Sequence, residues 1–320
     1  MQETDYFVVD VFTETALAGN PLAVVMNPGG LSTERMQAIA REFNLSETTF
    51  VERRPLAVEQ AEGVRVRIFT TQGELNFAGH PTLGTASVLR MHAPDAMQTD
   101  TVTLTLNVGP VPVRFDPEGF FGEMTQQDPE FGGELDPAEV ARLCGLRTVD
   151  FCPEFPPQVV STGTAFAIVL LNSLEALARL RVNQQEATPW LRERGARWFY
   201  VLADGDAEGR AGLRTFRARM QFHGGEDPAT GSAAGCAIAY LVLRGAVASG
   251  QRVHLRQGME IGRPSDLFVS ARAEPSREVS DLFERPETVT QSHWMEQARV
   301  TGVRVGGSTV PVAKGRLFLS

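Results

Sequence analysis

The chain has 320 residues, of which 42% are hydrophobic and 22% charged, as in folded globular proteins, and this length allows two domains. A net charge of −9 with scattered arginines argues against binding to nucleic acid or to an anionic membrane surface. No apolar run reaches about 18 residues, the acidic N-terminus is unlike a signal peptide, and three cysteines without CxxC spacing fit a reducing cytoplasm. We therefore expect a cytoplasmic protein, without a dedicated metal site, that acts on a small molecule.

Alternation of apolar and polar residues with a period of two is the dominant pattern, and it predicts strands. In the first half these strands fall at residues 4–13, 21–27, 64–70, 102–108 and 111–115. In the second half they fall at residues 157–171, 196–203, 213–222, 252–257, 267–273 and 300–319. Ser32 is a candidate cap for one helix, and Asp136 with Pro137 opens another. Because strands outnumber helices, the pattern favours an α+β fold with a largely antiparallel sheet.

A weak internal repeat relates the two halves of the chain. The segment His80-Pro81-Thr82-Leu83-Gly84-Thr85-Ala86 aligns with Asp227-Pro228-Ala229-Thr230-Gly231-Ser232-Ala233, at an offset of 147 residues. Each copy opens a helix, predicted at residues 82–91 and 229–244, and the second helix is small or apolar on nearly every side, which indicates a buried position. We expect two pseudo-symmetric domains, residues 1–125 and 126–320, each a mostly antiparallel barrel-like sheet wrapped around a central helix, with the last strand free to return to the first domain. The alternative is a chance match of a short motif.

The two predicted helix starts are candidate anion sites, because the first N–H groups of a helix lack partners and lie at the positive end of its dipole. Pro81 and Pro228 fit a first helical turn. Gly79 and Gly231 lack Cβ atoms where a ligand would approach closely. If a pseudo-twofold axis relates the halves, the two starts face each other across the cleft and can hold a small carboxylate between them.

The titratable groups at these starts are His80, Asp227 and Glu226, with Thr85 and Ser232 as hydroxyl donors. Taken singly, each start is better explained as an ordinary helix N-terminus with His80 or Asp227 as its cap, whereas the pairing of the two favours a ligand site. A further carboxylate, Glu47, lies where the first helix ends and a strand of threonine and valine begins. On the residues alone, an exposed loop glutamate is the simpler interpretation of Glu47.

Segments spread across nearly the whole chain occur in one recognisable order. They are Asp10-Val11-Phe12-Thr13, Gly19-Asn20-Pro21-Leu22-Ala23-Val24, Leu45-Ser46-Glu47-Thr48-Thr49-Phe50-Val51, Arg67-Ile68-Phe69-Thr70, Glu74-Leu75, Phe77-Ala78-Gly79-His80-Pro81-Thr82-Leu83-Gly84, Gly225-Glu226-Asp227-Pro228-Ala229-Thr230-Gly231-Ser232-Ala233, Gln257-Gly258, Gly262-Arg263-Pro264-Ser265 and Val305-Gly306-Gly307. Together they resemble the PhzF-like family of phenazine biosynthesis, within the diaminopimelate-epimerase fold.

This resemblance implies two pseudo-symmetric domains with the active site between them, a homodimer, and an isomerase that needs no cofactor. The characterised phenazine enzyme isomerises a dihydro-hydroxyanthranilate by moving a proton between ring carbons. Carried over residue by residue, its proton-shuttling glutamate falls on Glu47, and its supporting groups fall on Gly79, His80, Asp227 and Ser232. We therefore expect Glu47 to act as base and then acid, with assistance from His80 and Asp227.

The same resemblance leaves the substrate open beyond a small carboxylated molecule, whose carboxylate or developing oxyanion is expected at Gly79, Gly231 and Ser232. Residues 280–297 look like an insertion, and Thr71 and Asn76 stand where the family often has proline. Two other classes stay open, a non-catalytic small-molecule binder and an epimerase of an amino-acid-like substrate. Epimerases of this fold carry a cysteine at each helix start, whereas the nearest thiol here, that of Cys236, lies deeper in the predicted helix, where we expect it to pack.

Overall fold

The computed structural model describes residues 2–26, 29–96, 99–117, 119–205, 212–275 and 298–319. Its strands are β1 (Gln2–Val11), β2 (Asn20–Met26), β3 (Glu47–Glu52), β4 (Val64–Phe69), β5 (Glu74–Leu75), β6 (Thr101–Leu106), β7 (Gly109–Phe115), β8 (Phe121–Thr125), β9 (Glu130–Glu134), β10 (Gln158–Ser161), β11 (Ala165–Leu171), β12 (Trp198–Asp204), β13 (Thr215–Arg219), β14 (Gln221–Phe222), β15 (Gly225–Glu226), β16 (Val253–Gln257), β17 (Ser265–Pro275) and β18 (Ala298–Leu319). Its α-helices are α1 (Thr33–Phe43), α2 (Leu56–Glu62), α3 (Gly79–His92), α4 (Pro137–Cys144), α5 (Leu174–Ala178), α6 (Gln184–Glu193) and α7 (Gly231–Leu243).

The first half of the chain forms a closed ring of strands around α3. The strands pair in the order β1-β2-β3-β4-β6-β7-β8-β18, and β18 returns to pair with β1. Helix α3 lies inside this ring, in contact with strands on all sides, and its residues 79–89 are buried. Small residues permit the close packing, since a Cβ on Gly84 would lie 2.7 Å from side-chain atoms of both Leu22 and Val11.

The second half wraps a more open sheet around α7. The order continues from β18 through β17, β16, β13, β12, β11 and β10 to β9, and among the described residues no pairing joins β9 back to β18. Alternate residues of β11 face opposite ways, as the period of a strand requires. Phe166, Ile168 and Leu170 belong to the core that includes α7, whereas Ala167 and Val169 belong to a second core beneath α4, α5 and α6.

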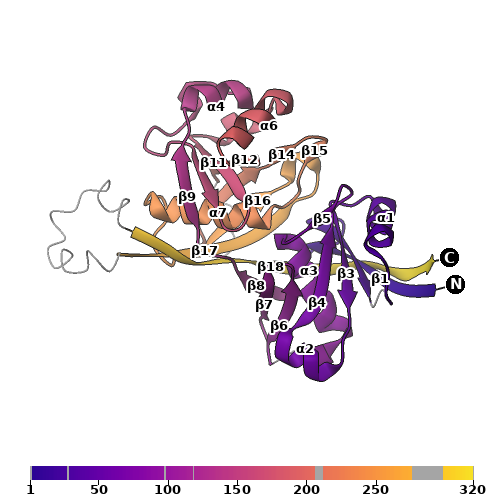
Figure 1. The fold of residues 1–320 in the computed structure, drawn as a ribbon. Coiled ribbons are helices and arrows are strands. Elements are labelled where there is room, and N and C mark those ends of the chain that lie inside the picture. The colour runs from indigo at the N-terminus through magenta and orange to yellow at the C-terminus, as the bar shows by residue number, and fades with distance from the viewer. Residues whose placement is uncertain are drawn as a thin grey trace.

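Strand β18 runs through both halves of the molecule (Figure 1). Its residues 298–306 pair with β17, residues 304–308 with β8, and residues 309–319 with β1. The predicted α+β fold, with mostly antiparallel sheets around two central helices, is confirmed. Of the helices in the described part of the chain, none combines the length and the apolar character needed to cross a bilayer.

Some predicted elements are wrong in detail. The strand predicted at residues 157–171 is a hairpin of β10 and β11, because the chain turns at Gly163, whose φ is +119°. The strand predicted at residues 213–222 is divided into β13 and β14. The predicted insertion at residues 280–297 lies outside the described residues.

Candidate active site

The first residues of α3 and α7 lie against each other where the two halves meet. A Cβ on Gly79 would come within 3.0 Å of the backbone nitrogen of Ser232 and within 3.1 Å of the carbonyl carbon of Gly231. A larger residue at position 79 would push these two backbones apart, so glycine favours their close approach. A carboxylate held by both helix starts would therefore lie beside the contact of Gly79 with Gly231, and the predicted carboxylate site at these residues stays a prediction.

The two copies of the sequence repeat do not occupy equivalent positions. His80 is the second residue of α3, whereas Asp227 lies four residues before α7. The N-caps are Ala78 and Thr230, and neither side chain makes a capping hydrogen bond. The interpretation of His80 and Asp227 as helix caps is therefore wrong, and Pro228 precedes its helix instead of lying in the first turn. Aligned on their first helical residues, the halves are offset by 152 residues, not by 147.

Glu47 is the first residue of β3, where it pairs with Leu22 of β2. Its side chain is only 17% exposed, so the interpretation as an exposed loop glutamate is wrong. Burial and, to a smaller extent, the negative charge of Asp227 raise the pKa of Glu47 to about 8, against the lowering effect of the positive charge of Arg197. Glu47 is thus a carboxyl group that keeps its proton at neutral pH and releases it slightly above.

His80 and Glu47 face each other without a hydrogen bond. His80 Nε2 lies 3.4 Å from Glu47 Oε2, and both atoms are buried without a hydrogen-bond partner in the described part of the chain. His80 Nδ1 lies 3.2 Å from the amide nitrogen of Asn20, which can only donate, so Nδ1 accepts and the proton is assigned to Nε2. Burial lowers the pKa of His80 to about 3, so the imidazole is neutral and presents an N–H on the side of Glu47.

Asn20 connects the two halves of the site, and the sequence analysis did not assign it a role. Its amide nitrogen lies 2.8 Å from Asp227 Oδ1 and 2.8 Å from the carbonyl oxygen of Ala229, in addition to its contact with His80. Its own Oδ1 is buried and has no partner among the described residues. One feature of the sequence could have indicated a role for Asn20. It is a polar amide at the start of the apolar strand β2, directly after Gly19.

Asp227 is held by hydrogen bonds from both sides. Its Oδ2 accepts from the Thr230 hydroxyl at 2.6 Å, and its backbone oxygen accepts from Gln257 Nε2 at 2.8 Å. Burial raises the pKa of Asp227 to about 6, against the lowering effect of the hydrogen bonds from Thr230 and Asn20. Gln257, which was also missed, accepts from the backbone nitrogen of Thr230 at 3.1 Å and so fixes the segment that leads into α7.

The sequence of the chain matches a known family. A model of the PhzC-PhzF family, described as phenazine biosynthesis-like protein, matches residues 9–283. The chain belongs to this family. A Pseudomonas aeruginosa relative named trans-2,3-dihydro-3-hydroxyanthranilate isomerase is 36% identical over 320 residues, which cover 98% of this chain and 99% of the relative. The protein is therefore an isomerase of the PhzF family.

Solved structures agree with the fold of this PhzF-family chain. A predicted epimerase from Pseudomonas aeruginosa is 33% identical, with a TM-score of 0.74, and the match covers 99% of this chain and 100% of that one. The PhzF-family phenazine biosynthesis protein of Bacillus anthracis has a TM-score of 0.80 at 24% identity over 100% of both chains. At this level of identity, the similarity to the Bacillus anthracis protein shows the fold alone.

Other groups considered from the sequence lie apart from this PhzF-family site. The hydroxyl of Thr85 lies 2.8 Å from that of Thr49 in the interior of the ring. Glu226 makes two hydrogen bonds with the guanidinium of Arg219, at 2.9 and 2.6 Å. Ser232, by contrast, is half-buried as the second residue of α7. No group of three or more His, Cys, Asp or Glu side chains in the described ranges is arranged to hold a metal ion.

The cysteines are unsuited to thiol chemistry at this site. Cys236 is buried, with its sulfur 3.5 Å from the Thr162 hydroxyl and 3.6 Å from the Thr164 carbonyl oxygen. Burial raises the pKa of Cys236 to about 11, so it stays a thiol at neutral pH. Cys144 is buried in the core beneath α4, and burial raises its pKa as well. These observations argue against the thiol-epimerase alternative.

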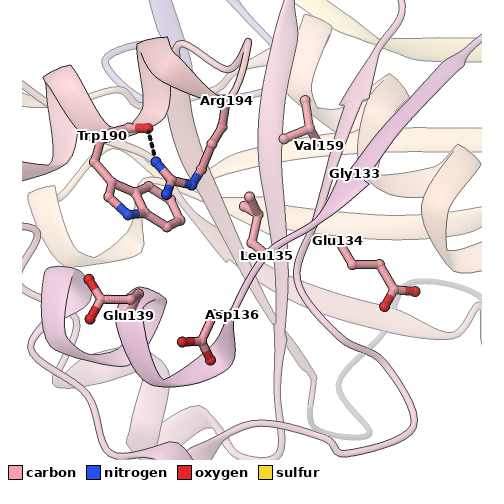
Figure 2. A pocket seen from close by; sticks show the side chains of 8 residues that line it. All are labelled: Gly133, Glu134, Leu135, Asp136, Glu139, Val159, Trp190 and Arg194. Carbon is pink, nitrogen blue, oxygen red and sulfur yellow. Dashed lines mark hydrogen bonds between the residues drawn. The ribbon is translucent and has the colours of Figure 1, made fainter.

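Of two cavities in the molecule, one lies between the two halves near the start of α3, and the other lies away from the site. One, of about 510 Å³, opens between the two halves and is lined in part by residues 74–77, just before α3. The other, of about 470 Å³, belongs to the second half alone and lies between β9, α4 and the end of α6. Figure 2 shows the second cavity, where the Arg194 guanidinium stacks on Trp190 at 4.0 Å from the ring centroid. It contains none of the candidate site residues.

Proposed function

We propose that this isomerase moves a proton between two carbon atoms of a small carboxylated substrate, with Glu47 as the acid/base and without a bound cofactor. The trans-2,3-dihydro-3-hydroxyanthranilate named for the Pseudomonas aeruginosa relative is the first compound to test. One observation carries the proposal. Glu47 Oε2 and His80 Nε2 are buried 3.4 Å apart without hydrogen-bond partners in the described residues, which favours a ligand as their missing partner.

Glu47 has the pKa that a reversible proton carrier needs. A catalytic group works best when its pKa is close to the working pH, because it must both take and return the proton. With a pKa of about 8, Glu47 is mostly protonated at neutral pH, and a minor ionised fraction is available as the base. In its ionised form it removes a proton from one carbon, and the electron pair of the broken C–H bond moves into the conjugated system. The protonated Glu47 then delivers the proton to the second carbon, so the reaction is balanced without an oxidant or reductant.

His80 and Asp227 support the transfer in different ways. A neutral His80, with Nε2 at 3.4 Å from Glu47 Oε2, donates a hydrogen bond to negative charge that develops on the substrate beside Glu47. Asn20 links the far side of its ring to Asp227, which fixes the tautomer that donates on the Glu47 side. The low pKa of His80 makes it a hydrogen-bond donor here and not a cationic acid.

The helix starts are the proposed site for the carboxylate of the substrate. The N–H groups near Gly79 on α3 and near Gly231 and Ser232 on α7 lie at the positive ends of two helix dipoles. Because these starts touch, a carboxylate beside them can be reached by donors from both helices. The substrate is then held by N–H groups of both halves, while Glu47 remains free for proton transfer.

Turnover in D₂O tests the proposal. Wild-type protein is incubated with trans-2,3-dihydro-3-hydroxyanthranilate, and conversion and deuterium content are measured by NMR and mass spectrometry. Glu47→Gln should lose at least about 10²–10⁴ of the rate, because an amide cannot accept and return the proton. The matched control is Glu52→Gln, at the other end of the same strand and near Arg65 at 3.9 Å, which should convert at the wild-type rate.

Two results would contradict the proposal. Conversion by Glu47→Gln at the wild-type rate would remove Glu47 from the mechanism. Failure of the wild-type protein both to convert the compound and to exchange its C–H protons would reject this substrate. Affinity measured on the same variant separates chemistry from binding, since the carboxylate is held by the helix starts and should bind the variant as it binds wild type.

A further inference from the structure

The cavity of about 510 Å³ lies beside the candidate active site, with walls from both halves of the chain. Its walls include residues 74–77, which lead into α3, and residues 162–164, which form the turn between β10 and β11. Gln126, another wall residue, donates from Nε2 to the carbonyl oxygen of Gly231 at 2.9 Å. The cavity thus adjoins the first residues of both central helices.

Arg197 contributes an unpaired positive charge to this cavity. Its guanidinium lies 4.1 Å from the centroid of the Trp198 ring, which holds it by a cation–π contact. Within the described residues, its guanidinium makes no hydrogen bond or ion pair, whereas the backbone nitrogen of Arg197 is fixed by the carbonyl oxygen of Ala165 at 2.9 Å. The exposed guanidinium of Arg197 is therefore held beside the Trp198 ring, and its five N–H donors have no acceptor among the described residues.

No other wall residue cancels that charge. Glu74 is the one acidic residue of the wall, and Arg67 donates to both of its carboxylate oxygens, at 2.9 and 2.6 Å. Asn107 donates to Glu74 as well, at 3.1 Å. These hydrogen bonds lower the pKa of Glu74, so its charge is present but already paired. The remaining wall residues are apolar or carry neutral amides and hydroxyls.

The same arginine acts on the proposed catalytic acid. The charge of Arg197 lowers the pKa of Glu47, against the effects of burial and of Asp227. The two side chains are therefore within electrostatic range of each other across the boundary between the halves. A substrate whose reacting carbons lie at Glu47 can extend toward Arg197, because Arg197 lines a cavity whose other walls adjoin the first residues of both central helices.

We propose that this cavity binds a second anionic group of the substrate, with Arg197 as its ionic partner. The proposal rests on the proposed function, since it assigns the first carboxylate to the helix starts. A guanidinium matches a carboxylate or a similar planar anion with two parallel hydrogen bonds, and the neutral amides and hydroxyls nearby can satisfy the remaining lone pairs. The substrate class is thus a compact molecule with two separated negative groups, and Arg197 is the residue that selects it. Trans-2,3-dihydro-3-hydroxyanthranilate, with its single carboxylate, lacks the group that Arg197 would bind.

A pair of rigid probes tests this assignment without the need for turnover. Anthranilate carries one carboxylate, and 2-aminoterephthalate has the same ring with a second carboxylate opposite the first. Their affinities are measured by calorimetry for wild type, Arg197→Gln, Arg197→Lys and Arg194→Gln. Arg194 is the matched control, because it is stacked on a tryptophan in the same way but lines the remote cavity of Figure 2.

The wild type is expected to bind 2-aminoterephthalate at least about 10-fold more tightly than anthranilate, as one charge-assisted pair would give. Arg197→Gln should abolish this preference, Arg197→Lys should keep part of it, and Arg194→Gln should keep all of it. Equal binding of the two probes to wild type, or an intact preference in Arg197→Gln, overturns the proposal. Failure of the proposed isomerisation appears separately, as absence of conversion in the Glu47 experiment, and leaves the affinity comparison readable.

Discussion

In each half of the molecule, an arginine–glutamate ion pair precedes the central helix. The two pairs differ in how deeply they are buried. Arg67 and Glu74 precede α3, and Arg219 and Glu226 precede α7, at the same offset of 152 residues that relates the helix starts. In both pairs the guanidinium donates to the two carboxylate oxygens at 2.9 and 2.6 Å. The first pair is 17% and 23% exposed, whereas the second is only 5% and 7% exposed.

The ion pairs and helix starts thus repeat in the two halves, but the acidic residues of the site do not occupy equivalent positions. The residue after Glu226 is Asp227, a buried acid, whereas the residue after Glu74 is an apolar leucine. The first half supplies its acid from a neighbouring strand instead, at Glu47. The helix starts and their ion pairs repeat, but the titratable groups do not, so the site has one candidate proton carrier and not two matched ones.

Replacing the glutamate of each ion pair is the sharpest test of the difference in burial between the two pairs. Glu226→Gln should lower the free energy of unfolding by about 3–5 kcal/mol, because it leaves the buried charge of Arg219 without its partner. Glu74→Gln should cost about 1 kcal/mol, since Arg67 stays accessible to water. Urea denaturation measures both. Equal losses would show that burial does not distinguish the pairs.

Glu47, the acid of the first half that has no equivalent in the second, should also affect how the stability of the protein depends on pH. The folded protein holds a proton on Glu47 up to about pH 8, while the unfolded chain releases it near 4.5, so wild type loses stability as the pH rises between these values. Glu47→Gln removes this dependence and should gain about 1–4 kcal/mol relative to wild type between pH 4.5 and pH 9. Denaturation curves at both pH values check the gain, with Glu52→Gln as the control. A constant difference between wild type and variant would contradict the raised pKa.

The equivalence of the two helix starts is tested at their second residues, His80 of α3 and Ser232 of α7. His80→Ala and Ser232→Ala should each weaken binding of anthranilate by about 1–3 kcal/mol, the cost of leaving a charged acceptor short of a donor. Aniline, which lacks the carboxylate, should bind poorly and respond to neither change. Titration calorimetry on both ligands gives the comparison. If aniline loses as much affinity as anthranilate, the carboxylate is held elsewhere.

The smallest effect is expected from the thiols. A variant with Cys144, Cys152 and Cys236 all changed to Ala should keep its rate of conversion, because neither helix start carries a sulfur atom. Some stability should be lost at Cys236, which is fully buried. The rate of the folded variant, together with its resistance to an alkylating reagent, checks the prediction. A complete loss of activity would restore the thiol-epimerase hypothesis.

Local patterns in the sequence were sufficient for much of the fold. Alternation predicted most strands, and the small-residue composition of residues 229–244 predicted the buried helix α7, because both properties belong to a single element. The repeat was found but misaligned, since proline and glycine dominate the sequence match while the position of the first helical residue depends on tertiary packing. Resemblance, and not local pattern, pointed to Glu47.

The residues that were missed act through contacts between distant segments. Asn20 reaches Asp227 across 207 positions of the sequence, and Gln257 reaches Thr230 from strand β16 of the second half. In the sequence, nothing distinguishes Arg197 from the other arginines. Only the cavity between the halves, which it lines, suggests a role for it. No periodicity or motif encodes such pairings, because each depends on how the two halves are assembled.

The shared strand β18 has a consequence for how this protein is made. The ring around α3 closes only when residues 309–319 pair with β1, and these two partners are separated by roughly 300 residues of chain. At about 5–20 residues per second, β1 waits on the order of 15–60 s after it leaves the ribosome for its second neighbour. Throughout that time one edge of β1 offers unpaired N–H and C=O groups to other nascent chains. The yield of soluble protein in cells should therefore depend on translation speed and on chaperones that shield strand edges.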